Sequence, residues 1–117
     1  MQRDFTKYPN DDNGNVLWRL LEHGDDHAVS RDIDFCLDFS TEEAAVDCGV
    51  FLFRNEYKVQ LEPPIENDRD SPWTVLAIPH MAPDYSEICA VESHLKEIAR
   101  HFGGECSGWG CATAGAP

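Results

Sequence analysis

Residues 31–39 alternate between apolar and polar side chains, and this pattern constrains the fold more than any other feature of the sequence. Large apolar groups take every second position, and carboxylates fill most of the positions between them. The apolar members are Ile33, Phe35, Leu37 and Phe39, and the carboxylates are Asp32, Asp34 and Asp38. A period of two indicates a β-strand with one face in the core and the other in solvent.

Two helices are predicted by capping side chains that precede apolar residues at helical spacing. The first begins near the capping residues Asp11-Asp12-Asn13 and ends at Gly24, which suits a left-handed cap. The second is predicted from about 41 to 55. Ser40 and Glu43 form an S-x-x-E capping box at its start. Its expected buried stripe consists of Ala44, Cys48, Phe51 and Leu52.

A third helix, the longest, is predicted after Pro83 and Asp84 and ends at the glycine pair 103–104. Steps of three and four separate the apolar residues, as one buried helix face requires. The expected stripe consists of Ile88, Val91, Leu95, Ile98 and Phe102.

Three further strands are predicted from short apolar or alternating segments. Residues 57–61 alternate and stop at two prolines, 63–64. Residues 73–78 are apolar on both faces, as in a central strand, and Pro79 is expected to end their ladder. Residues 105–111 are predicted to form a last short strand.

The order of elements is therefore one helix followed by β-α-β-β-α-β. This order predicts an α+β fold of the ferredoxin-like type, in which two helices cover one face of a four-stranded antiparallel sheet. The segments 33–39 and 73–78 are expected in the centre of the sheet. We expect a single domain over 1–117, with a core of about 12–111 and loose ends at 1–9 and 112–117.

The chain carries a net charge of −13, with 22 acidic residues against nine Lys and Arg. Such a charge repels phosphate backbones, so direct nucleic-acid binding is not expected. It favours encounter with a basic partner, although solubility alone also accounts for an acidic surface. The sequence has no apolar run long enough to span a membrane and no secretory signal at its start, so a cytoplasmic protein is predicted.

No arrangement of residues in the sequence indicates catalysis, a metal site or a cofactor. The five cysteines lack CxxC spacing and lie in apolar stretches, so we expect reduced, packing thiols, Cys89 among them. The histidines show no zinc-binding pattern, and His94 and His101 are expected near the solvent face of the last helix. A protein without enzymatic activity is predicted.

Two features are candidates for binding. Asp32, Asp34 and Asp38 could form a divalent-metal site, an acidic surface for a basic partner, or a solvated strand face. Trp109, between Gly108 and Gly110, could cap one end of the core or serve as an aromatic anchor for a partner. These four side chains, the three aspartates and Trp109, are the predicted partner-binding residues.

Several segments of the chain resemble the bacterial regulator of ribonuclease activity B family. The resemblance covers roughly residues 12–111, and Ser107 stands where members commonly have Asp. The most specific segments are Arg31-Asp32-Ile33-Asp34-Phe35 and Gly108-Trp109-Gly110, with further similarity in Gly24-Asp25-Asp26, Pro72-Trp73-Thr74-Val75, His80-Met81-Ala82-Pro83 and Gly103-Gly104. The resemblance implies a ferredoxin-like domain that inhibits ribonuclease E by binding it.

Three hypotheses about function remain open at this point. The first is a protein-binding regulator of a ribonuclease. The second is a ferredoxin-like module that binds an unrelated protein or forms a homodimer. The third is a small-molecule or metal-dependent activity on the sheet face.

Overall fold

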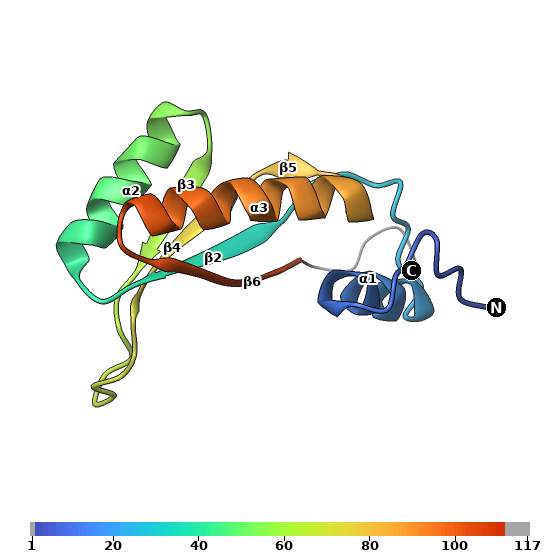
Figure 1. Cartoon of the computed structure of the whole chain (residues 1–117), viewed down its shortest axis with the longest axis horizontal. Helices are drawn as coiled ribbons and strands as arrows, with labels where there is room; N and C mark the ends of the chain where they lie inside the picture. Colours follow the sequence, from blue (N-terminus) through green and yellow to red (C-terminus); the bar gives the residue numbers. More distant parts are fainter. Residues whose placement is uncertain (1, 112–117) are drawn as a thin grey trace.

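A computed structural model describes residues 2–111 and shows a mixed α+β fold with three helices and antiparallel sheets (Figure 1). The predicted frayed end at 112–117 lies outside the described residues. In chain order the elements are α1 (Asp12–Glu22), β1 (Arg31–Asp32), β2 (Asp34–Phe39), α2 (Glu42–Arg54), β3 (Lys58–Glu62), β4 (Trp73–Ile78), β5 (His80–Met81), α3 (Tyr85–His101) and β6 (Glu105–Gly110).

The main sheet has four strands in the order β3-β4-β2-β6, and every neighbouring pair is antiparallel. The prediction that the two most apolar segments lie in the centre is therefore confirmed. Helix α2 packs on β3 and β4, and α3 packs on β2 and β6. Both helices share one core with the buried strand residues Phe35, Leu37 and Val75, so they cover the same sheet face.

The single strand predicted over 31–39 is wrong in one respect, because the chain forms two ladders there. Asp32 in β1 pairs with His80 in β5, whereas β2 pairs with β4 and β6 in the main sheet. Between them, the Ile33 amide donates to the Pro79 carbonyl at 3.0 Å. Pro79 interrupts the partner strand as predicted, since it has no amide to donate, and pairing resumes beyond it as β5.

All three helices begin at a side-chain cap, and one of the predicted caps is off by a residue. Asp11 accepts the Gly14 amide at 2.7 Å, and Asp84 accepts a backbone amide in the same way. At α2 the cap is Thr41, which accepts the Ala44 amide at 3.2 Å, and not Ser40. Thr41 is the last residue with extended backbone before the helix, so its hydroxyl is the one that faces the free amides.

The buried stripe of α2 also differs from the prediction. Ala45, Cys48 and Leu52 are fully buried, whereas the predicted Phe51 is exposed and its ring lies 5.5 Å from that of Phe102. Ala45, Cys48 and Leu52 therefore face the sheet, and the Phe51 ring lies at the edge between α2 and α3. The stripe of α3 is confirmed at Ile88, Leu95 and Ile98, which are buried.

Helix α1 lies beside α3 at one end of the molecule (Figure 1). Leu17 is fully buried, and Asn13 donates to Glu92 of α3 at 3.2 Å. Gly14 allows close packing here, because a Cβ at this position would lie 1.9 Å from the Pro9 carbonyl oxygen. Since α1 packs on the helical side, it does not cover the opposite face of the main sheet within the described residues.

Candidate partner-binding surface

Asp34 and Asp38 lie on the sheet face that α2 and α3 leave open. Alternation in β2 directs the buried Phe35 and Leu37 toward the helices and the two aspartates away from them. Asp38 accepts a hydrogen bond from the Thr74 hydroxyl at 3.0 Å. The strand pattern predicted for these residues is thus reproduced in β2.

Asp38 belongs to a row of side chains that crosses all four strands. The register joins Glu62 to Thr74, Thr74 to Asp38, and Asp38 to Glu105. We call Glu62, Thr74, Asp38 and Glu105 the acidic row. With strands about 4.8 Å apart, the row spans roughly 14 Å. None of its three carboxylates takes part in an ion pair within residues 2–111, so their charge faces solvent.

Asp32 lies in a cluster at the start of β3, where Lys58 contacts it. Its carboxylate contacts His80 Nδ1 at 3.0 Å and Lys58 Nζ at 3.2 Å. Hydrogen bonds from His80 and then from Lys58 hold the pKa of this carboxyl below its ordinary value. The cluster is exposed, and the Lys58 ammonium already balances the negative charge of Asp32.

Trp109 lies on the opposite side of the sheet from Asp34 and Asp38. Its ring centroid is 6.4 Å from that of Phe35, and its indole nitrogen donates to the Asn13 side-chain oxygen at 2.7 Å. The half-buried ring also lines a groove of about 620 Å³ between α1, α3 and β6. These contacts favour the core-capping interpretation, and the role of Trp109 in partner binding stays a prediction.

The four predicted binding residues therefore do not form one surface. Asp34 and Asp38 share the open sheet face, Asp32 is paired with Lys58 and His80, and Trp109 lies on the helical side. The sequence analysis missed Glu62 and Glu105, the other two carboxylates of the acidic row. Period-two alternation could have placed Glu62 on the open face, but only the register of β6, which shifts between Cys36 and Leu37, brings Glu105 beside Asp38.

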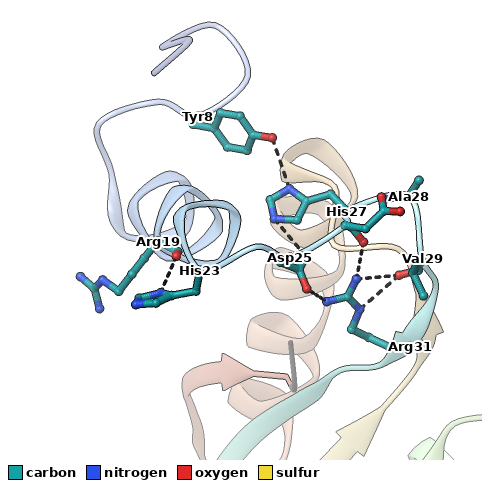
Figure 2. Close-up of polar contacts among 9 residues, drawn as sticks. Tyr8, Arg19, His23, Asp25, His27, Ala28, Val29 and Arg31 are labelled. Carbon is teal, nitrogen blue, oxygen red and sulfur yellow. Dashed lines mark hydrogen bonds and ion pairs between the residues drawn. The ribbon is translucent and has the colours of Figure 1, made fainter. Parts of the chain in front are cut away.

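A buried polar network, shown in Figure 2, fixes the loop between α1 and β1. The Arg31 guanidinium contacts the Asp25 carboxylate and donates to the Asp26 and Val29 carbonyls at 2.7 and 2.9 Å. Asp25 and Arg31 are only 4% and 8% exposed. Breaking a buried pair of this kind costs about 3–5 kcal/mol, so the network organises the loop.

His27 extends this network to the N-terminal segment (Figure 2). Its Nε2 lies 3.2 Å from the Asp25 carboxylate, and its Nδ1 lies 3.3 Å from the Tyr8 hydroxyl. Burial lowers the pKa of His27, and Arg31 lowers it further, against an opposing effect of Asp25. The sequence analysis gave these residues no role, because loop residues carry no periodic signal.

Within residues 2–111, no group of three or more His, Cys, Asp or Glu side chains is placed to hold a metal ion. The cysteines described there are free thiols, and burial raises the pKa of Cys48 to about 11. Cys89 is half-buried and accepts a hydrogen bond from Asn13 at 3.4 Å. His94 and His101 lie on exposed positions of α3. The described helices include none that is long and apolar enough to cross a membrane.

Comparison with protein families gives a match over nearly the whole chain. The family model described as regulator of ribonuclease activity B matches residues 10–111. A comparison with curated proteins returned no match.

Proposed function

The chain belongs to the regulator of ribonuclease activity B family, and on this premise we propose that it modulates RNA degradation by binding ribonuclease E. The family match carries this proposal, since it spans all nine helices and strands of the described chain. The family is defined by regulation, so we propose that the protein acts by contact and without a reaction of its own. A cytoplasmic location follows from this role.

We propose that the open sheet face contributes to this binding. Asp34 and the acidic row present carboxylates that form no ion pair within residues 2–111. A negative surface accelerates encounter with a basic partner and disfavours acidic ones. The net charge of −13 also opposes contact with RNA itself, so regulation through the nuclease is the better physical fit.

This proposal extends the set of predicted partner-binding residues. Asp34 and Asp38 gain Glu62 and Glu105 as neighbours on the same face. Asp32, in its cluster with Lys58 and His80, and Trp109, on the helical side of the sheet, remain predicted contacts. We further propose that β2-α2-β3-β4-α3-β6 is a ferredoxin-like sandwich, supported by the antiparallel order β3-β4-β2-β6 and by helices on one face.

The proposal is tested by titrating purified ribonuclease E with the wild-type chain and measuring both affinity and RNA cleavage. A double variant, Glu62→Lys with Glu105→Lys, reverses two charges of the acidic row. Its matched control, Glu22→Lys with Glu97→Lys, changes exposed positions on α1 and α3. Two Glu-to-Lys exchanges add four charge units, so both variants carry −9 in place of −13.

We expect the acidic-row variant to weaken binding and inhibition roughly tenfold, because about 1.4 kcal/mol of interaction corresponds to that factor. The control should retain most of the affinity. Wild-type chain that neither binds ribonuclease E nor slows RNA cleavage would contradict the proposed function. Equal losses of affinity in both variants would show that only the net charge of the protein matters, and not the position of the acidic row.

A further inference from the structure

An apolar groove runs between α2 and β3 and borders the core, since Ala45 and Val75 contribute to its lining. Its volume is about 260 Å³. We call it the α2–β3 groove, and it is lined mainly by Val46, Gly49, Val50, Phe53, Val59 and Leu61. Phe53 is 69% exposed and Val50 is 43% exposed, although both are large apolar side chains. Contiguous exposed apolar surface of this kind marks interaction sites.

The α2 wall of the groove is a second apolar stripe beside the core stripe. Val46, Val50 and Phe53 follow steps of four and three, which place them on one side of the helix. Ala45, Cys48 and Leu52 form the other stripe and are fully buried. Val46, Val50 and Phe53 themselves are exposed and lie outside that core stripe.

Strand β3 supplies the floor of the groove and is also an edge of the main sheet. Within the described residues β3 pairs with β4 alone, so its outer edge has unpaired backbone donors and acceptors. The register places Val59 and Leu61 on the helical side of the sheet, beside α2. A strand added at this edge would direct every second side chain toward Val50 and Phe53.

The other sheet edge is less suitable for strand addition. The ladder between β2 and β6 shifts register between Cys36 and Leu37, and Gly108 has a φ of 149°. Such irregularities bend a strand and disrupt pairing at its outer edge. The pairing edge available to a partner is therefore that of β3.

Charge around the groove selects the kind of partner. Glu42, Glu43, Asp47 and Glu56 are exposed on or just after α2, against Arg54 of α2 and Lys58 of β3, and Lys58 is paired with Asp32. A second copy of this chain would bring another −13 charge to an already acidic surface, which opposes self-association there. A segment with Lys or Arg would instead be attracted.

We propose that the α2–β3 groove binds an extended segment of a protein partner that alternates aliphatic residues with Lys or Arg. The segment adds to β3 as an extra strand, its aliphatic side chains enter the groove, and its cations face the surrounding carboxylates. The inference rests on the proposed function in one respect, that the partner is a protein.

The test uses the whole chain and a defined probe, a fluorescent peptide of sequence Lys-Val-Lys-Ile-Lys-Val-Lys with blocked ends. A peptide with Ser in place of Val and Ile has the same charge and no apolar side chains. Fluorescence polarisation at physiological ionic strength gives the Kd of each. We expect the apolar peptide to bind at least tenfold more tightly than the serine peptide.

Two variants change the groove in different ways. Val50→Lys removes an apolar lining group and adds a cation that repels the basic peptide. Ala90→Lys, at an exposed position of α3, is its charge-matched control. Gly49→Leu fills the groove without a change of charge, and a Cβ there lies 4.0 Å from Val75, an ordinary contact. Thermal melts verify that each variant is folded.

We expect Val50→Lys and Gly49→Leu to weaken peptide binding at least tenfold and Ala90→Lys to leave it nearly unchanged. Equal binding of the two peptides, or unchanged binding to the folded groove variants, would overturn the proposal. A wild-type dimer that Val50→Lys converts to monomer would overturn it in favour of self-association. Ribonuclease E binding is measured separately, so its absence would contradict the proposed function while the peptide titration still decides the groove.

Discussion

The indole nitrogen of Trp109 donates a hydrogen bond of 2.7 Å to the side-chain oxygen of Asn13, which joins β6 to α1. Asn13 in turn donates to Glu92 at 3.2 Å and to Cys89 at 3.4 Å. One amide side chain thus connects the first helix, the last helix and the last strand.

We expect Trp109→Phe to lower the free energy of unfolding by about 1 kcal/mol, since the ring stays apolar but the donor is lost. The melting temperature should fall by roughly 3–6 °C. A double-mutant cycle with Asn13→Ala measures the coupling by urea unfolding. Fully additive effects of the two changes would show that this hydrogen bond contributes nothing to stability.

Gly104→Ala should destabilise the turn between α3 and β6. An added Cβ would lie 2.4 Å from the Asp38 carbonyl oxygen and 2.6 Å from the Phe39 ring. Overpacking of this kind costs about 1–3 kcal/mol. Gly110→Ala is the matched control, because no atom lies within 4 Å of its added Cβ. Equal melting temperatures for the two variants would contradict this contact.

Acidification should weaken the protein through His27. Its pKa lies below the ordinary value of 6.5 because the ring is buried and Arg31 is near, so the unfolded chain takes up the proton first. The contribution of neutral His27 to stability is therefore fully present above pH 6.5. It is lost as the pH falls from there toward the pKa of His27 in the folded protein. Urea unfolding from pH 7.5 to 5.5 should show a steeper loss for wild type than for His27→Gln. The same slope in both proteins would assign the pH dependence to other groups.

Cys48 should resist alkylation in the folded protein. Burial raises the pKa of its thiol to about 11, so at pH 8 only about one molecule in a thousand carries the reactive thiolate. Iodoacetamide labelling followed by peptide mass spectrometry should find Cys48 modified only after denaturation in urea. Native-state labelling as fast as that of the unfolded chain would contradict the burial of this side chain.

Patterns within short segments were sufficient to predict most helices, strands and their order. Asp11 and Asp84 cap their helices as expected, and the alternation of Phe35 and Leu37 gave the correct buried face of β2. These features depend on residues a few positions apart. For that reason the sequence carries them without knowledge of the tertiary structure.

Features that depend on distant partners were not predictable in the same way. The break of the 31–39 strand follows from Pro79, more than forty positions along the chain. Glu105 reaches Asp38 only through a register shift, and Asp25 meets Arg31 only because the loop folds back. The candidate binding surface was therefore found in part, as Asp34 and Asp38, while its remaining carboxylates required the register.

The central position of β2 has a consequence for synthesis on the ribosome. Both of its neighbours, β4 and β6, are translated after it. At a translation rate of about 5–20 residues per second, β4 is synthesised roughly 2–8 s after residues 34–39. During that interval Phe35, Leu37 and Phe39 lack their sheet partners, and we expect the nascent chain to be most prone to aggregation or chaperone capture at this stage.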